Sequence, residues 1–201
     1  MLVRTIKTWW LVLAFVSGFG LAMLAEDLAL RWHNNLIEFS APHLHFLSGK
    51  PLERLHSGAQ VPFDVKISLF SGRKDHLSSQ LAERFLVSYS VWEEQFRVIK
   101  TQSPRKLVDH LDLADAEAWC LKQMPMEPVG IGDQDSLWAR VEVRVPSDAK
   151  LSNPFGVGEA GINLNGLIEL FSRPPATQYH WTTEAGPLTL EELKRPTRRG
   201  I

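Results

Sequence analysis

The stretch from Val61 to Lys100 constrains the fold more than any other part of this 201-residue chain. Apolar and polar residues alternate along it, first from Val61 to Phe70, then from Phe85 to Val91 and from Phe96 to Val98. Successive side chains of a strand point to opposite faces, so this period of two predicts strands with one face toward a core and one toward water. The pattern therefore favours an antiparallel sheet with one solvated face.

Further patterns extend the sheet and add helices. Strands are predicted within residues 28–40, 61–71, 82–101 and 136–146, and Asn34-Asn35 predicts a tight hairpin turn inside the first range. Apolar residues at helical spacing predict helices at 104–121 and 162–172. The predicted fold class is therefore α+β, an antiparallel β-sheet with covering helices, and a β-sandwich without a covering helix is the alternative.

Capping residues mark where the helices begin. Ser103-Pro104 fits the start of the 104–121 helix, since serine is a frequent N-cap and proline suits the first helical position. Asp112 offers a second N-cap if that helix is broken. The run Thr189-Leu190-Glu191-Glu192 has the pattern of a capping box, which predicts a small helix near the C-terminus.

The N-terminal segment is basic and then apolar. Arg4 and Lys7 precede 18 residues without charge, from Thr8 to Ala25. This length lies between the apolar region of a signal peptide and the roughly 20 residues of a membrane span. Residues 1–25 are therefore predicted to be a signal peptide or a single transmembrane anchor. The positive residues before it place the rest of the chain on the extracytoplasmic (periplasmic) side, secreted or anchored in the inner membrane.

Beyond the leader, residues 26–173 are predicted to form one extracytoplasmic β-rich domain, followed by a Pro-rich, partly disordered tail at 174–201. Lys and Arg total 22 against 23 Asp and Glu, a net charge of -1, which excludes the basic footprint of a nucleic-acid-binding protein. The single cysteine, Cys120, can form no intrachain disulfide and is predicted to be a buried small apolar residue.

The order of these features resembles the small exported bacterial proteins of the domain-of-unknown-function 4390 family. The resemblance covers roughly residues 28 to 172 and rests on patterning: a basic-apolar leader, Leu52 to Gly58, the strand from Pro62, the Val87 to Tyr89 and Phe96 to Val98 strands, a Ser-initiated helix and the Trp138 to Val145 strand. It implies an extracytoplasmic β-rich domain without assigned catalytic residues. The chain departs from the family pattern in its glycine-rich loop and in the predicted Gly161 to Arg173 helix, which is followed by a Pro-Pro tail.

Gly156-Val157-Gly158-Glu159-Ala160-Gly161 matches the letters of a dinucleotide-binding motif. Such a site requires a buried strand that runs into the first glycine, and Asn153-Pro154-Phe155 stands there instead. The motif is therefore interpreted as a glycine loop, and no cofactor is predicted.

His43 and His45 are spaced to share one face of a strand and could supply two imidazoles to a metal ion. Zinc and copper sites usually need three or four ligands, so solvated strand histidines are the favoured interpretation. A metal-dependent enzyme that uses His43 and His45 stays an alternative.

Trp92 and Trp138 lie off the main apolar sets of their strands. They either belong to the covered core or form an exposed aromatic surface for binding. The sequence contains no nucleophile elbow, P-loop or zinc-protease motif, so the favoured function is a non-catalytic extracytoplasmic binding or assembly protein with a protein partner. A single-span accessory subunit of a membrane complex is the alternative, with Gly18 and Ala22 as small residues that let the leader helix pack closely.

Overall fold

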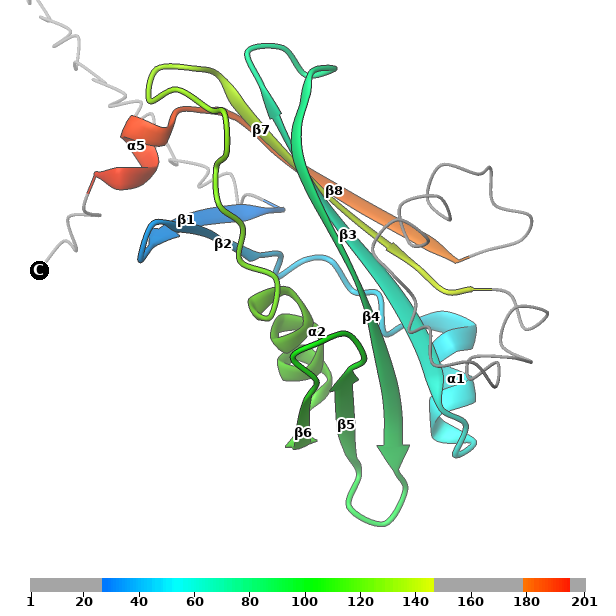
Figure 1. Ribbon diagram of the computed structural model, residues 1–201. Coiled ribbons are helices and arrows are strands. Elements are labelled where there is room, and N and C mark those ends of the chain that lie inside the picture. Colours follow the sequence, from blue (N-terminus) through cyan, green and yellow to red (C-terminus); the bar gives the residue numbers. More distant parts are fainter. Residues whose placement is uncertain (1–26, 147–178, 196–201) are drawn as a thin grey trace, which may run out of the picture.

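The computed structural model of the protein describes residues 27–146 and 179–195 (Figure 1). The predicted leader with Gly18 and Ala22, the glycine loop at 156–161 and the predicted helix at 162–172 lie outside the described residues. Within the described ranges, no helix is both long enough and apolar enough to cross a bilayer.

The main element is a six-stranded antiparallel sheet in the order β6-β5-β4-β3-β7-β8. Its strands are β3 (Val61–Ser71), β4 (Leu77–Ser90), β5 (Gln95–Lys100), β6 (Lys106–Leu111), β7 (Leu137–Arg144) and β8 (His180–Leu188). Two further strands, β1 (Ala29–His33) and β2 (Leu36–Ser40), pair with each other, and the helices are α1 (Gly49–His56), α2 (Leu113–Lys122) and α5 (Leu190–Lys194). The coarse prediction of an α+β fold built on antiparallel strands is confirmed.

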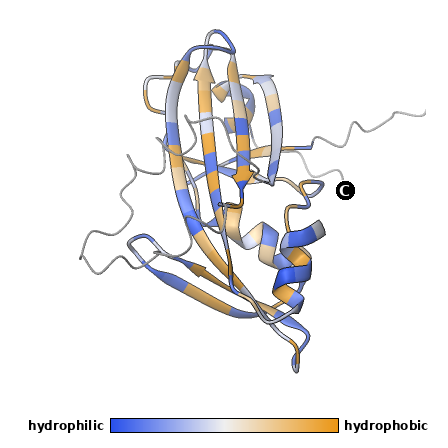
Figure 2. Cartoon of the chain, turned by 90° about the vertical axis from the view of Figure 1, so that its right-hand side faces the viewer, coloured by the Kyte–Doolittle hydropathy of each residue, from blue (hydrophilic) through white to orange (hydrophobic). Residues whose placement is uncertain are grey.

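The predicted alternation sorts the two faces of the six-stranded sheet. We call the face that carries Phe63, Val65 and Ile67 the inner face, and the face that carries Asp64 and Lys66 the outer face. The inner residues of β3 are fully buried, and the apolar residues of β7, from Leu137 to Val143, share their face. Figure 2 shows the resulting apolar and polar bands along the strands. Because successive side chains of a strand point to opposite faces, the register of strand pairing fixes which residues face the core.

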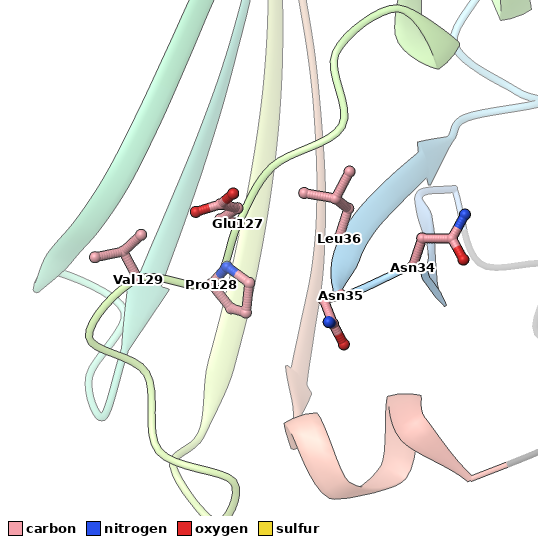
Figure 3. Close-up of a pocket in the computed structure, with 6 residues that line it drawn as sticks. All are labelled: Asn34, Asn35, Leu36, Glu127, Pro128 and Val129. Atoms are coloured by element: carbon pink, nitrogen blue, oxygen red, sulfur yellow. The ribbon is translucent and has the colours of Figure 1, made fainter.

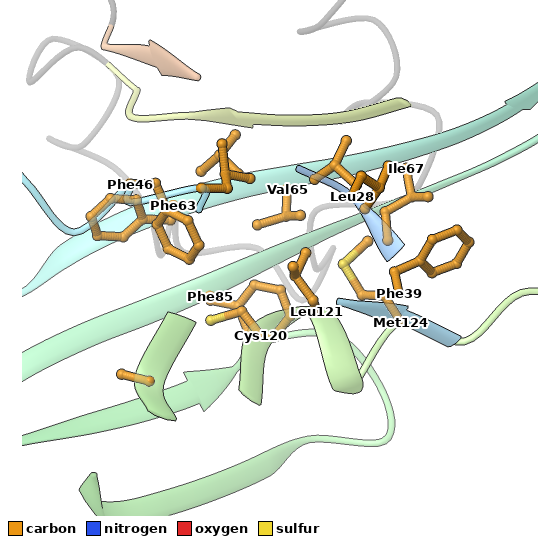
Figure 4. Packing of buried hydrophobic residues seen from close by; sticks show 14 of the residues in the cluster. Leu28, Phe39, Phe46, Phe63, Val65, Ile67, Phe85, Cys120, Leu121 and Met124 are labelled. Atoms are coloured by element: carbon orange, nitrogen blue, oxygen red, sulfur yellow. The ribbon is translucent and has the colours of Figure 1, made fainter. Parts of the chain in front are cut away.

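The core lies between the inner face and a layer formed by α1, α2 and the β1–β2 hairpin. Figure 4 shows side chains from β3, β4, β2 and α2 pointing toward one another across this space. Phe46 and Phe63 are both fully buried, with ring centroids 5.5 Å apart, and Trp119 of α2 meets Phe85 edge-on at 6.1 Å. These aromatic contacts join the layer to the sheet.

The hairpin predicted at Asn34-Asn35 is present. Both residues have positive φ, 49° and 63°, which is the conformation that a two-residue hairpin turn requires and that asparagine tolerates well. The hairpin does not join the six-stranded sheet. Instead, Ile37 exchanges backbone hydrogen bonds with Met126, at 2.8 and 3.0 Å, so the segment after α2 holds the hairpin over the core.

The predicted helix at 104–121 is wrong in its first half, where the chain forms strand β6. Val108 pairs with Val98 and Leu111 pairs with Phe96, so three steps on β6 match two steps on β5. This bulge, with His110 at a φ of 60°, returns Leu111 to the same face as Val108. The second half is helical as predicted, and the Asp112 side chain caps α2 by accepting a hydrogen bond from the Asp115 N–H at 2.7 Å.

The C-terminal range 174–201, for which a tail was predicted, contains strand β8, and the sequence did not predict that strand. The small helix after it was predicted and is present as α5. The Thr189 hydroxyl accepts from the Glu192 N–H and the Glu192 carboxylate accepts from the Thr189 N–H, which is the predicted capping box. Leu190 is buried, so α5 adds to the core at the end of β8.

Candidate binding surface

The most exposed large apolar residue of the described chain lies at the turn between β4 and β5. We call residues 91–94 the hairpin tip. Trp92 has 97% of its surface exposed and its neighbour Val91 has 58%. An exposed tryptophan leaves a large apolar area in water, and such residues are enriched where proteins bind partners. Trp92 is therefore a solvent-exposed aromatic residue at the hairpin tip and does not belong to the covered core.

A rigid base supports the hairpin tip. The β4–β5 ladder continues to the pair Ser90 and Gln95, directly below the tip. Tyr89 and Phe96 lie opposite each other with ring centroids 4.9 Å apart, and His56 of α1 lies 4.5 Å from the Tyr89 ring. Because the paired strands and these rings fix the backbone on both sides of the turn, Trp92 is presented from an ordered position.

The charges around the hairpin tip are mainly acidic. Glu93 and Glu94 follow Trp92 directly, and both are exposed. His110 on the β6 bulge lies 3.7 Å from the Glu93 carboxylate, and the nearby Arg97 already pairs with Asp109 at 2.6 Å. The tip therefore presents one large apolar group beside two carboxylates.

Trp138 does not share a surface with Trp92. It is the second residue of β7 and lies on the outer face, beside Phe70 near the end of β3. The hairpin tip follows the other end of β4 (Figure 1). The Trp138 side chain is half-buried, and a Cβ at Gly186 would lie only 2.9 Å from the Trp138 Cδ1. Trp138 therefore packs against the bend in β8, and Gly186, whose φ is 117°, makes room for it.

His43 and His45 lie in the loop after β2 and not in a strand as predicted, although they do point away from the buried Leu44 and Phe46. Each histidine faces a single carboxylate: His43 lies 3.7 Å from Asp27, and His45 lies 3.2 Å from Glu117. Over residues 27–146 and 179–195, no three His, Cys, Asp or Glu side chains gather closely enough to hold a metal ion. The two histidines are not brought to a common ligand set.

Glu117 is a buried acid that sequence analysis did not single out. Its carboxylate accepts a hydrogen bond from the Leu47 N–H at 2.7 Å and contacts the His45 ring at 3.2 Å, so it fastens the 43–48 loop to α2. Cys120, one turn further along α2, is fully buried as predicted. Burial, and then the charge of Glu117, raise the pKa of the Cys120 thiol far above its usual range, so it stays protonated and inert.

Paired charges cover the centre of the outer face. Asp64, which is fully buried, accepts two hydrogen bonds from Arg84, at 2.5 and 2.8 Å. Glu142 contacts Lys66, Arg144 and His180, and Glu184 pairs with Arg140 and Lys74. Arg144 shares strand β7 with Glu142, and Lys74 lies in the loop between β3 and β4. The other pairs join neighbouring strands, so they act as cross-strand ties.

Glu142 makes the stability of the protein dependent on pH. Burial works to raise the pKa of Glu142, but the hydrogen bond from Lys66 and the charges of Lys66, Arg144 and His180 outweigh it and lower the pKa below its usual value. A carboxyl group whose pKa is lower in the folded protein than in the unfolded chain stabilises the fold at pH values above its unfolded pKa. This stability is lost as the pH falls through its folded pKa. We expect Glu142→Gln to cost about 1 to 2 kcal/mol at neutral pH.

The same variant should lose less stability than the wild type between about pH 5 and pH 3. Urea unfolding curves at both pH values measure the difference. If the free energy of unfolding fell by the same amount in both proteins between these pH values, Glu142 would not be the source of this pH dependence.

The described chain also has a shallow cavity of about 390 Å³, between the β1–β2 turn and the segment after α2 (Figure 3). It is lined by Asn34, Asn35, Leu36, Glu127, Pro128 and Val129. Glu127 is the one ionisable residue on these walls, and it stands without a second acid, base or nucleophile in the lining. The cavity therefore has no pair of groups for acid–base or nucleophilic chemistry.

Comparisons with protein-family models, with curated proteins and with solved structures found no match to this chain.

Proposed function

We propose that this chain is a non-catalytic, extracytoplasmic binding or assembly protein that holds a protein partner through the hairpin tip. The exposure of Trp92 carries the proposal. A tryptophan side chain that becomes buried at an interface removes about 150 to 250 Å² from water, which makes it a typical hot spot worth about 2 kcal/mol or more. The supported hairpin adds to this, because an ordered group loses little conformational freedom when it binds.

A protein partner fits the tip better than a lipid surface does. Glu93 and Glu94 lie beside Trp92, and carboxylates are repelled by anionic headgroups. A protein pocket can instead take the indole in an apolar centre and place Lys or Arg side chains near the two carboxylates. The expected partner therefore has an apolar pocket with a basic rim.

The non-catalytic part of the proposal rests on the setting of the reactive groups. Cys120 is buried and protonated, Glu127 stands alone in its cavity, and His43 and His45 each face one carboxylate. None of these groups forms a nucleophile–base pair with another. The extracytoplasmic location rests on the basic and apolar residues 1–25.

Replacing Trp92 with alanine should weaken partner binding by about 30-fold or more, which corresponds to the 2 kcal/mol of a hot spot. The partner is first captured in the host by a photo-crosslinking amino acid at position 92, and its affinity for purified wild type and Trp92→Ala is then compared. Folding should be unchanged because the Trp92 side chain is almost fully exposed.

Leu77 provides the matched control. It is 45% exposed at the opposite end of β4, so Leu77→Ala should leave the affinity within about twofold. Equal capture from positions 77 and 92 would refute a specific surface at the tip. If the wild type, but not Trp92→Ala, bound protein-free phospholipid vesicles, the binding partner of the tip would be a membrane surface and not a protein.

A further inference from the structure

The six-stranded sheet has two edge strands, and they differ in how they are protected against pairing with another chain. An open edge presents unpaired backbone N–H and C=O groups, and proteins usually block it with charges, bulges or short strands. Edge strand β6 has all three protections: it has six residues, it begins at Lys106, and the bulge at His110 interrupts it. Edge strand β8 is built differently.

Strand β8 is regular over most of its length. From His180 to Ala185 it pairs with β7 in an unbroken register, and the irregularity at Gly186-Pro187 comes only afterward. The stretch His180-Trp181-Thr182-Thr183-Glu184-Ala185 contains no lysine, arginine or proline, and its one acid, Glu184, is paired with Arg140 and Lys74. Among the described residues, the backbone hydrogen bonds outside the β7 ladder that lie nearest to β8 are made by Tyr179 and Thr189, which flank the strand. Within the described residues, the outward edge of β8 is therefore a template for another strand.

We propose that the edge of β8 pairs with β8 of a second copy of this chain, in antiparallel orientation. A twofold axis perpendicular to the sheet gives this arrangement and keeps inner face beside inner face. Only residues on the same face can then lie opposite each other, so the axis must pass beside one residue of the strand. The regular stretch allows Thr182 or Thr183 as its central residue.

Complementary polar side chains select Thr182. With Thr182 opposite itself, His180 lies opposite Glu184 of the second copy, and the same pair recurs on the other side of the axis. These side chains already lie on the outer face, where Thr182 pairs with Glu142 and Glu184 pairs with Arg140. With Thr183 on the axis, His180 would lie opposite Gly186 and this complementarity would be lost. An imidazole N–H can donate a hydrogen bond to the facing carboxylate, and paired threonines across strands are also stabilising.

The same register also fits the shape of the strand. The pairing uses residues 180 to 184, so Gly186 and Pro187 lie beyond the paired segment and do not interrupt it. On the inner face, each Trp181 lies opposite Thr183 of the second copy, which covers an indole that already packs on the core edge. The two six-stranded sheets then continue as one.

A single cysteine tests this register. In the full chain, Thr182→Cys places two thiols directly opposite each other, with Cα atoms about 4.5 to 5.5 Å apart in an antiparallel ladder. Disulfides form at Cα separations of about 4.4 to 6.8 Å, so mild oxidation should give a covalent dimer. The native Cys120 is buried and should not contribute.

Thr183→Cys is the matched control, since it lies one residue away on the same exposed edge but opposite Trp181 of the second copy. It should stay unlinked under the same oxidation. Linkage of Thr183→Cys alone would overturn the register, and equal linkage or no linkage in both variants would overturn the pairing.

A second measurement does not depend on disulfide chemistry. Thr182→Lys places two like charges opposite each other at the axis and should weaken the dimer. The dimer of the full chain should then dissociate at a protein concentration about tenfold higher than the wild type does. Light scattering over a concentration series measures the mass. A wild-type mass equal to the monomer at all concentrations would overturn the proposal.

Discussion

Replacing Lys100 with methionine is expected to lower the free energy of unfolding by about 3 kcal/mol at neutral pH. Lys100 Nζ lies 2.9 Å from Glu83 Oε1, and the side chains are only 10% and 6% exposed. Among the described residues, the second carboxylate oxygen, Glu83 Oε2, is buried without a hydrogen-bond partner. Methionine keeps the length of the lysine stem but removes the charge that compensates the buried carboxylate, so Glu83 must take up a proton or remain uncompensated.

This loss should depend on pH. Burial raises the pKa of Glu83, and the hydrogen bond and charge of Lys100 oppose that rise. Without Lys100, the folded pKa rises further above the unfolded value, so Lys100→Met should become less stable as pH increases from about 5 to 8. Denaturant unfolding at the two pH values measures this slope.

The double variant Glu83→Gln with Lys100→Met is the control, because it removes the buried charge together with its partner. It should recover at least half of the lost stability. A double variant no more stable than Lys100→Met, or a single variant with no pH slope, would show that the buried charge is not the cause of the loss.

The prediction from sequence succeeded where a strand is covered on one face and central in the sheet. Strand β3 has the predicted bounds, 61 to 71, because its inner residues all face the core and alternate without interruption. The Asn34-Asn35 turn and the Thr189 capping box were also predicted correctly. In these segments the local residue preferences and the tertiary contacts favour the same structure.

Strand β6 was missed because its spacing is ambiguous. Leu107, Val108 and Leu111 stand at positions typical of one helix face. In a regular strand, Val108 and Leu111 would point to opposite faces, and only the bulge at His110 brings them together. A bulge depends on the partner strand, so the sequence of this segment alone does not reveal it.

Strand β8 was missed for a different reason. It lies at an edge, where β7 is its one partner among the described strands, and its side chains are exposed or half-buried along the whole strand. Such a strand needs no continuous apolar face, so the alternation that identifies a core strand is weak. Pro187 near its end also resembles a loop signal.

The candidate surface was predictable only in part. Trp92 could be named as a residue outside the main apolar set, but its exposure depends on whether another element covers the β4–β5 turn. Glu117 could not be found, because its contact with His45 joins residues 72 positions apart. In the sequence of an amphipathic helix, a buried acid looks the same as a solvent-exposed one. The two can be told apart only when the position of the loop that contacts the acid is known.

Phe63 and Phe70 allow the assignment of the two faces to be tested within one strand. Both belong to β3, but Phe63 is fully buried on the inner face against Phe46, whereas Phe70 is half-buried on the outer face beneath Arg140, at 5.2 Å. Phe63→Ala removes a side chain from a packed core and leaves a cavity, so we expect a loss of about 3 to 5 kcal/mol in the free energy of unfolding.

Phe70→Ala should cost only about 1 kcal/mol, because it loses one cation–π contact and a partly solvated surface. The two variants change the same residue type in the same strand, so their difference reports the environment of each face and not β-propensity. Urea denaturation with a shared slope gives both values. Similar losses in the two variants would mean that the outer face is packed as closely as the inner one, and the division of this sheet into a core face and a charged face would then be wrong.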